Sequence, residues 1–360
     1  MRLTKLQVSQ FRGLAEQEIS LGDGLNLLAG ENGQGKSSLL EAIYLLGTTR
    51  SFRTSRLSEV IRVEGGPARV AGIGEEPGHS LAILLSRSDR QYLRNGKAAS
   101  PAEYIGTLDV VALSSDIVQG FRRKPAERRR FLDRMALATW PGYLAELGDL
   151  RRACLQRSLL AAAGVSGRER IAWDERAATL SLPVVSKRLA MAEALGHHLR
   201  EASRRIFPEG EGAVVRLVSR PPFAPDREKE YVDMLREIFS AQEPSGGRRE
   251  TPAGPLRDDL AVLIEGRDLL RFGSSGQFRS LLTAAVLAEM NRLKGVKGVY
   301  PVMLLDDVDA DLDEGRYAAL LSGLEGEAQI FAATSKPGLA IGAARPARRF
   351  TVARGAVNPS

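Results

Sequence analysis

A glycine-rich segment in the first tenth of the chain has the residue types needed to hold a row of phosphates. The segment GENGQGKS, residues 30–37, fits the pattern G-x4-G-K-[ST] without departure. Its glycines let backbone N–H groups close on phosphate oxygens, Lys36 supplies a positive charge, and Ser37 supplies a hydroxyl ligand for Mg²⁺. A chance glycine turn is the alternative, but an apolar strand pattern precedes the loop and a helical pattern, residues 37–46, follows it. We therefore predict a nucleotide-binding loop here.

Two carboxylates follow an apolar segment near the other end of the chain. The segment VMLL, residues 302–305, reads as a buried strand and ends in Asp306 and Asp307. A carboxylate at the end of such a strand, beside a phosphate loop, is where an Mg²⁺ ligand belongs, so we assign Asp306 to the metal. Asp307 is expected to face the γ-phosphate and orient the attacking water. The alternative is a solvated acidic turn. Lys36, Asp306 and Asp307 are the candidate catalytic residues.

A serine- and glycine-rich turn precedes a long helical pattern before that acidic pair. Residues 272–279 read FGSSGQFR, and the helix is expected over residues 280–291. Free N–H groups at such a helix start can bind an anion. Taken alone, the segment is more typical of plain capping, with Ser274 or Ser275 as the cap.

The composition and the hydrophobic pattern of the sequence change twice along the chain. The opening third mixes strand patterns with one helix, which Gly47 could cap, and Asn95-Gly96 marks a tight turn between two strands. Residues 125–207 are rich in Ala, Leu, Arg and Glu, and Pro141, Gly164 and Pro183 are expected to divide them into several helices. Loops dominate residues 208–257, apart from a helical patch at residues 231–239. We expect an α/β domain, residues 1–120 and 261–360, interrupted by a mostly helical insertion, residues 121–260.

Composition restricts the class of protein. The chain has 360 residues, of which 43% are hydrophobic and 26% charged, as in ordinary globular proteins. Its single cysteine, Cys154, excludes an intrachain disulfide. The sequence has no apolar leader and no stretch of about 18 apolar residues, so we expect a cytoplasmic protein without a membrane partner. The net charge of +7 favours a polyanionic partner.

A run of arginines near the start of the insertion is a candidate contact with a phosphate backbone. Arg128, Arg129 and Arg130 follow one another, so only part of the run can face one ligand. The alternative is a solvated helix face with Glu127 and Asp133 as partners. Binding through these residues would be independent of base sequence and sensitive to salt.

Taken in this order, the motifs resemble those of the ABC-type ATPase heads of the SMC group. Residues 274–277, SSGQ, resemble the signature motif, and the Asp306-Asp307 pair resembles the Walker B acids, although many relatives have Glu where this chain has Asp307. Residues 310–313 resemble the D-loop. Residues 331–335 resemble the switch region, with Thr334 in place of a histidine. Phe11-Arg12-Gly13 resembles a turn whose arginine reaches the bound nucleotide.

Within that group the chain most resembles the RecF family of bacterial recombination mediators. The residues that carry the resemblance are RNGK at 94–97, PAERRRFLD at 125–133 and LDDV at 305–308. Two departures stand out. Four residues, FRRK, separate Gly120 from Pro125 where the family usually has one, and Ala310-Asp311 stands where the D-loop usually has Ser-Glu or Ser-His.

The resemblance implies an ABC-type ATPase head, with a mixed sheet and a phosphate loop, that uses ATP and Mg²⁺. The nucleotide-binding residues are then Arg12, Gly30, Asn32, Gly33, Gly35, Lys36, Ser37 and Ser38. Ser274, Gly276 and Gln277 of one protomer would contact the γ-phosphate held by Lys36 of the other, so ATP would join two copies into a homodimer. Thr334 is the switch residue, and residues 114–116 are the candidate Q-loop.

The resemblance further implies a weak, DNA-stimulated ATPase in recombinational repair, DNA replication and the SOS response to DNA damage. It would bind gapped or junction DNA, double- and single-stranded, and help load recombinase with RecR- and RecO-like mediator proteins. An energy-coupling subunit of a membrane transporter is a competing hypothesis, but Thr334, the helical insertion and the arginine run favour the repair protein. An SMC-type tether is a third, but the insertion lacks sustained heptads.

Overall fold

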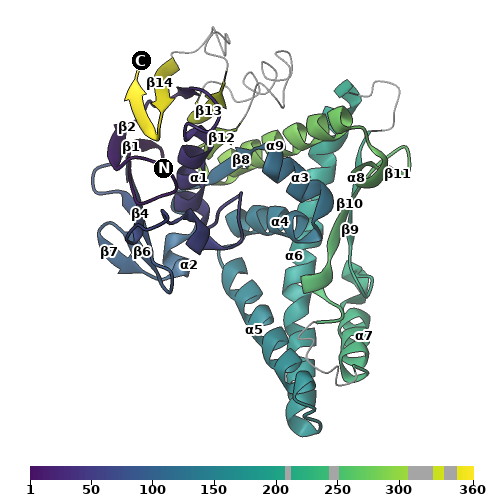
Figure 1. Cartoon of the computed structure of the whole chain (residues 1–360). Coiled ribbons are helices and arrows are strands. Elements are labelled where there is room, and N and C mark those ends of the chain that lie inside the picture. The colour runs from purple at the N-terminus through teal and green to yellow at the C-terminus, as the bar shows by residue number, and fades with distance from the viewer. Residues whose placement is uncertain (207–211, 243–250, 307–326, 336–346) are drawn as a thin grey trace. The chain divides into compact units, whose positions relative to one another are not determined.

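Two six-stranded sheets build unit 1, one of two compact units in this computed structural model (Figure 1). Unit 1 comprises Met1–Gly120 and Arg279–Ser360, and unit 2 comprises Phe121–Phe278. The structure describes residues 1–206, 212–242, 251–306, 327–335 and 347–360, and every structural statement below concerns these residues.

One sheet of unit 1 is antiparallel, in the order β2-β1-β4-β5-β6-β7. Its strands are β1 (Leu3–Ser9), β2 (Gln17–Ser20), β4 (Ala68–Gly74), β5 (Ser80–Leu85), β6 (Arg90–Arg94) and β7 (Lys97–Ala99). Alternation along β1 buries Leu6 and Val8, and a register shift between Leu3 and Lys5 places Leu3 on the buried side as well. The turn predicted between β6 and β7 is confirmed, since Asn95 and Gly96 have φ values of 53° and 74°.

The other sheet of unit 1 is mainly parallel, in the order β15-β14-β3-β13-β12-β8. Its strands are β3 (Leu25–Ala29), β8 (Val110–Leu113), β12 (Val302–Leu305), β13 (Ile330–Thr334), β14 (Ala347–Ala353) and β15 (Ala356–Pro359). Every residue of β8, β12 and β13 is buried, as expected for parallel strands covered on both faces. The carboxyl ends of β3, β8, β12 and β13 therefore meet at one edge of the sheet.

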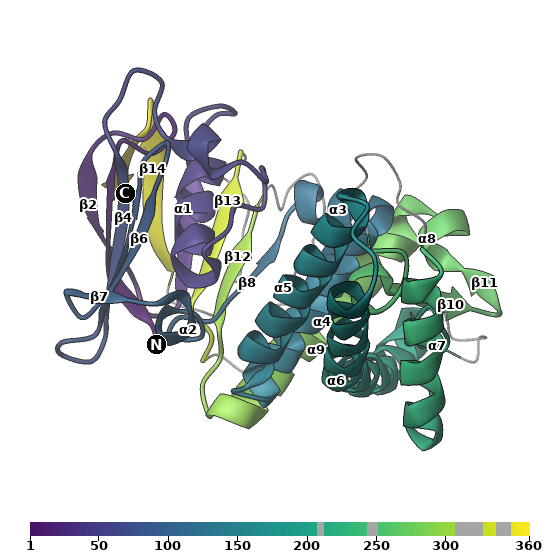
Figure 2. The same ribbon diagram turned by 90° about the horizontal axis from the view of Figure 1, so that it is seen from below.

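Helix α1 (Lys36–Thr48) lies between the two sheets of unit 1 (Figure 2). Its buried residues include Leu39, Leu40 and Ile43, which pack into the common core of both sheets. The cap predicted at Gly47 is wrong: the helix continues to Thr48, and Thr49 ends it with φ 59°. Gly47 instead lets α1 approach β8, because a Cβ atom there would lie 2.3 Å from Val110 Cγ2.

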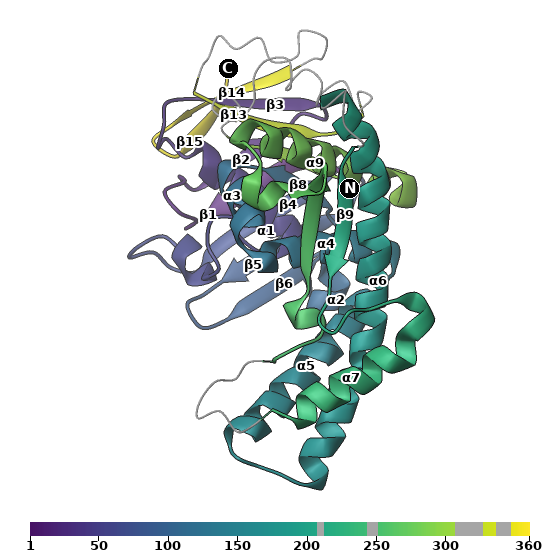
Figure 3. The same ribbon diagram turned by 90° about the vertical axis from the view of Figure 1, so that its right-hand side faces the viewer.

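Unit 2 is mostly helical (Figure 3). Its main helices are α4 (Pro125–Thr139), α5 (Tyr143–Ala162), α6 (Arg168–Ile206) and α7 (Glu228–Ser240), and α5 and α7 both pack against α6. The break predicted at Pro183 is wrong, because α6 continues through it. A proline removes one backbone donor, and burial of the adjacent Val184 and Val185 holds the helix in place.

A three-stranded sheet, β11-β10-β9, packs beside these helices in unit 2. Its strands are β9 (Val214–Val218), β10 (Asp259–Ile264) and β11 (Arg267–Asp268). The proline- and glycine-rich pattern of residues 208–257 predicted a loop where β9 lies. Because β10 pairs with β9, residues 261–278 group with the helices, and the chain returns to unit 1 at Arg279.

The remaining helices are short or continue from one unit into the other. They are α2 (Pro101–Tyr104), α3 (Ser115–Arg123), α8 (Leu269–Phe272) and α9 (Ser275–Lys297), with 3-10 turns at Leu57–Val60, Pro225–Arg227 and Pro255–Arg257. In the part of the chain that the structure describes, no helix combines the length and the apolar character that crossing a membrane needs.

Candidate functional site

The phosphate loop connects β3 to α1, and its glycines occupy positions that other residues fit poorly. Gly33 and Gly35 have φ values of 81° and 113°, in the region that glycine adopts readily. At Gly30 a Cβ atom would lie 2.3 Å from the carbonyl oxygen of Val352. The loop conformation thus explains why glycine stands at these three positions.

Positive charge and backbone donors converge at the start of α1. The N-cap, Gly35, offers no side-chain acceptor, and the first turn of the helix carries no acidic residue. The Lys36 side chain is almost completely buried, and its Nζ donates to the carbonyl oxygens of Gly30 at 2.7 Å and Glu31 at 2.9 Å. The helix dipole, the N–H groups and the ammonium group all favour an anion at this loop. Asn32 lies exposed on the loop, and Ser38 is half-buried in the first turn.

Parallel pairing brings the acidic segment to the same edge. Thr334, at the end of β13, pairs in register with Ala29, the last residue of β3, and is fully buried. Asp306 directly follows β12, and its N–H donates to the carbonyl oxygen of Leu113 at the end of β8 at 3.0 Å. Asp306 and Thr334, predicted from two distant segments, therefore lie at the sheet edge beside the phosphate loop.

Ser37 and Asp306 present two oxygen ligands suited to Mg²⁺. Ser37 Oγ donates to Asp306 Oδ1 at 2.9 Å. Neighbouring ligands of an octahedral Mg²⁺, each about 2.1 Å from the ion, lie about 3 Å apart. In the described ranges no group of three or more His, Cys, Asp or Glu residues could hold a metal. Mg²⁺ commonly takes one or two protein ligands and completes its shell with water and substrate phosphates.

Asp307, the residue predicted to orient water, and residues 310–313, predicted as the D-loop, lie outside the described residues.

Arg12 is engaged by a carboxylate that the sequence reading missed. Its guanidinium forms two hydrogen bonds with Glu41, at 3.0 and 2.7 Å, and a third with the carbonyl oxygen of Glu59 at 2.8 Å. Glu41 is completely buried on α1 and also accepts from Ser51 and pairs with Arg53. In this structure the guanidinium of Arg12 therefore binds the carboxylate of Glu41. A lone carboxylate inside the apolar run LLEAIYLL is the signal that could have revealed it.

The serine–glycine turn lies in unit 2 and caps α9. Ser274 Oγ accepts from the N–H of Gln277 at 3.2 Å, and Gln277 Oε1 accepts from the N–H of Ser274 at 3.0 Å. This reciprocal pair is a capping box. It orients the first turn of α9, which Gly276 also joins, so Ser274 acts as a cap in the isolated chain.

The three arginines of the basic run have different surroundings. For Arg128 the structure favours a structural role: it is 5% exposed, and it binds Asp259 through two hydrogen bonds at 2.6 and 2.8 Å. Its guanidinium therefore does not face solvent as a DNA contact would. Arg129 donates to the carbonyl oxygen of Asp258 at 2.7 Å, and Arg130 pairs with Glu127. The Arg130 side chain is 39% exposed.

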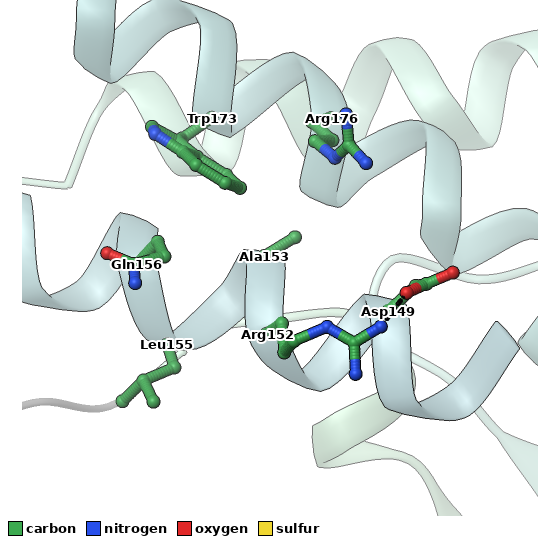
Figure 4. Close-up of a pocket in the computed structure, with 7 residues that line it drawn as sticks. All are labelled: Asp149, Arg152, Ala153, Leu155, Gln156, Trp173 and Arg176. Atoms are coloured by element: carbon green, nitrogen blue, oxygen red, sulfur yellow. Dashed lines mark hydrogen bonds and ion pairs between the residues drawn. The ribbon is translucent and has the colours of Figure 1, made fainter. Parts of the chain in front are cut away.

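A shallow pocket of about 200 Å³ lies between α5 and α6 in unit 2 (Figure 4). Trp173 and Arg176 line it from α6, and Arg152 and Gln156 from α5. Arg152 pairs with Asp149, and the Arg176 guanidinium lies over the Trp173 ring at 5.9 Å, so both basic groups of the pocket already have a partner.

Residues 2–357 match the RecF/RecN/SMC N terminal domain family. A solved SMC head bound to a winged-helix domain of ScpA has the same fold, with a TM-score of 0.56 at 18% identity over the whole of this chain and 97% of that one. The predicted fold class, a mixed α/β head with a helical insertion, is confirmed. Fold and phosphate loop together define an ATP-binding head of the ABC/SMC type.

The particular family follows from closer relatives. The DNA replication and repair protein RecF of Geobacter sulfurreducens is 32% identical over 100% of both chains, and that of Myxococcus xanthus is 34% identical over 96% of this chain and 93% of its own. A solved structure of the recombination mediator protein RecF with ATP superposes with a TM-score of 0.89, at 26% identity over 100% of this chain and 97% of that one. The chain belongs to the RecF family.

Proposed function

We propose that the protein binds DNA in an ATP-dependent manner during recombinational repair, as an ATP-induced homodimer that hydrolyses ATP slowly. The observation that carries this proposal is the meeting of Ser37 and Asp306 beside the Lys36 loop, because it supplies the metal and phosphate contacts of one nucleotide site. A relative with the same fold was solved with ATP.

In this proposal unit 1 is the ATPase head and unit 2 is the arm inserted into it. Lys36 and the loop N–H groups hold the phosphates, Ser37 and Asp306 hold Mg²⁺, and Asp307 orients the attacking water. Bound Mg²⁺ neutralises phosphate charge. Asp307 is one methylene shorter than glutamate, so we expect slow hydrolysis. Thr334 at the end of β13 would respond to the γ-phosphate.

The nucleotide site would be completed by a second copy of the chain. Ser274, Gly276 and Gln277 of one protomer would contact the γ-phosphate held by Lys36 of the other. The place of these residues at the start of α9 supports this role, since the N-terminal end of a helix favours an anion. ATP would then hold the two copies together, and hydrolysis would release them.

The substrate and partners follow from the family. A solved relative is described as a recombination mediator in the RecFOR pathway. We infer that this chain acts in the cytoplasm on gapped or junction DNA and helps load recombinase with RecR- and RecO-like partners. With +7 net charge, its DNA contacts would be independent of sequence and weakened by salt, with Arg129 and Arg130 as the available members of the basic run.

The test is fluorescence anisotropy with gapped and blunt duplex DNA, with and without ATP and Mg²⁺. We expect tight binding of the wild type only with ATP, at least ten-fold weaker binding of Lys36→Met, and loss of affinity as salt rises. Lys229→Met is the matched control, because this exposed lysine on α7 carries the same charge away from the loop. Equal binding with and without ATP contradicts the ATP dependence, and absence of binding in every state contradicts the repair function.

A further inference from the structure

One arginine of unit 2 holds the turn that precedes Ser274. Arg122 Nη2 donates to the carbonyl oxygen of Gly273 at 2.8 Å, and Arg122 Nε donates to that of Leu270 at 3.1 Å. These two carbonyls lie at the end of the single-turn helix α8, directly before the serine–glycine turn. The planar fork of a guanidinium suits two such acceptors better than an ammonium group does.

The turn itself has little freedom. A Cβ atom at Gly273 would lie 2.6 Å from the carbonyl oxygen of Leu269 and 2.5 Å from a methyl carbon of its side chain. The backbone therefore passes close to α8, and the direction of the Gly273 carbonyl fixes the peptide that carries the Ser274 N–H. Arg122 therefore binds the peptide group directly before the first turn of α9.

Arg122 is itself fixed from two sides. Its guanidinium lies over the ring of Phe278 at 5.5 Å, on the first turns of α9. Arg128 donates to the carbonyl oxygens of Phe121 and Arg122 at the end of α3, and it is anchored by Asp259 of β10. The end of α3, the turn and the start of α9 are therefore braced as one cluster.

The other end of α3 begins at the edge where the nucleotide site lies. Ser114, which follows β8, accepts a hydrogen bond from the N–H of Ile117 in the first turn of α3 at 3.2 Å. The preceding residue, Leu113, accepts from the N–H of Asp306. Ser114 thus caps the start of α3 within unit 1.

We propose that Arg122 is a positioning residue for the signature turn, and that by binding the Gly273 and Leu270 carbonyls it sets the orientation of Ser274 toward a nucleotide held by a second copy. This inference rests on the proposed ATP-induced dimer. It assigns to Arg122 no contact with DNA and none with the nucleotide of its own chain.

The experiment compares Arg122→Ala, Arg122→Lys and Arg123→Ala. Arg123 is the matched control, because it is the adjacent, exposed residue of α3 and its substitution by alanine removes the same charge. For Arg122→Ala we expect binding of a fluorescent ATP analogue to the monomer within two-fold of wild type, and ATP-induced dimerisation, followed by light scattering, weakened at least ten-fold. Arg122→Lys should recover part of the dimerisation, because its ammonium group can still reach one carbonyl. Arg123→Ala should match wild type.

Mixing variants separates this role from a general loss of folding. A mixture of Lys36→Met and Ser274→Arg calibrates the measurement of ATP hydrolysis. Its mixed dimer keeps one intact composite site, made of Lys36 from the Ser274→Arg copy and Ser274 from the Lys36→Met copy. Arg122→Ala should recover hydrolysis to the same extent with Lys36→Met and not at all with Ser274→Arg. If the wild type and Arg122→Ala dimerise equally well with ATP, the proposed role of Arg122 is wrong, while the proposed dimer stands. A wild type that stays monomeric with ATP and Mg²⁺ overturns the proposed dimer, and this role with it.

Discussion

At the residue scale, the site depends on single oxygen atoms from opposite ends of the chain. Ser37 and Asp306 are 269 residues apart in sequence, yet their side chains share a hydrogen bond. The two oxygen atoms lie 2.9 Å apart, close to the spacing of neighbouring Mg²⁺ ligands. They can therefore bind one ion with little movement. We therefore expect the chemistry of the site to depend on the carboxylate charge of Asp306 as well as on the lysine of the loop.

Asp306→Asn tests that dependence. An amide oxygen binds Mg²⁺ more weakly than a carboxylate, so we expect the variant to lose at least ten-fold in ATP affinity with Mg²⁺ and little in EDTA, where Lys36 and the loop still hold the phosphates. The measurement is titration of a fluorescent ATP analogue in both conditions. Asp109→Asn, in the same unit and paired with Lys297, is the control and should bind like wild type. Unchanged Mg²⁺ dependence in Asp306→Asn would remove Asp306 from the metal site.

The residues of the phosphate loop could be predicted because one short motif carries their chemistry. Partners across the fold could not. Glu41 binds Arg12, and Asp259 binds Arg128, only because the chain folds back over 29 and 131 residues. A local sequence motif contains no information about partners so far along the chain. For this reason the sequence predicted Arg128 as a candidate surface contact with DNA.

At the element scale, the packing of α1 between two sheets leaves no room at its end. Gly47 is buried where a Cβ atom would meet Val110 of β8 at 2.3 Å and the carbonyl oxygen of Leu108 at 2.9 Å. Glycine costs about 1 kcal/mol of helix propensity relative to alanine, so its presence within α1 reflects the close approach to the strand.

Gly47→Ala should therefore destabilise the chain, by about 1–3 kcal/mol of unfolding free energy, as overpacking of a core does. Gly148→Ala is a matched control within α5, where the nearest atom to a new Cβ is the end of the flexible Arg152 side chain at 3.5 Å. There the same substitution should be neutral or stabilising by up to about 1 kcal/mol. Urea unfolding of both variants measures the difference. If Gly47→Ala were as stable as Gly148→Ala, the close approach of α1 to β8 would be contradicted.

Elements with strong local patterns matched their predictions, and those that depend on tertiary context did not. The apolar strand at Leu25–Ala29 and the turn at Asn95-Gly96 carry their own signals. Pro183 reads as a break, but packing around it keeps α6 continuous. Strand β9 has few buried residues and is stabilised by pairing with β10, 45 residues further on, so its own sequence reads as loop.

At the scale of the whole molecule, unit 2 is held by buried charge from several elements. Arg188 of α6, 1% exposed, pairs with Asp133 of α4 and with Asp258, which directly precedes β10. Tyr143 of α5 also donates to Asp133. Breaking such a network by removing one member leaves an uncompensated buried charge.

This network makes the stability of the chain depend on pH. Burial raises the pKa of Asp258 from 3.8 to about 6, despite the opposing charge of Arg188. The native carboxyl therefore binds its proton more tightly than the unfolded one, and this contribution to stability is lost as pH rises from about 4 to about 6. Two pKa units correspond to at most roughly 3 kcal/mol.

Asp258→Asn should remove that part of the pH dependence. The measurement is the difference in unfolding free energy between wild type and variant at pH 4.5, 5.5 and 6.5. We expect it to change in favour of the variant as pH rises. Asp233→Asn, at an exposed position of α7, is the control and should leave a constant difference. Parallel pH profiles for wild type and Asp258→Asn would contradict the raised pKa.

The order of strands in the parallel sheet has a consequence for synthesis. Strand β3, which ends at the phosphate loop, lies between β13 and β14, and both are encoded about 300 residues later. When synthesis has reached Phe278, all of unit 2 is present, whereas the loop still follows a strand that has neither of its neighbours. The nucleotide site becomes complete only with the last segments to emerge, so a chain that stops early holds the loop sequence without the sheet that shapes it.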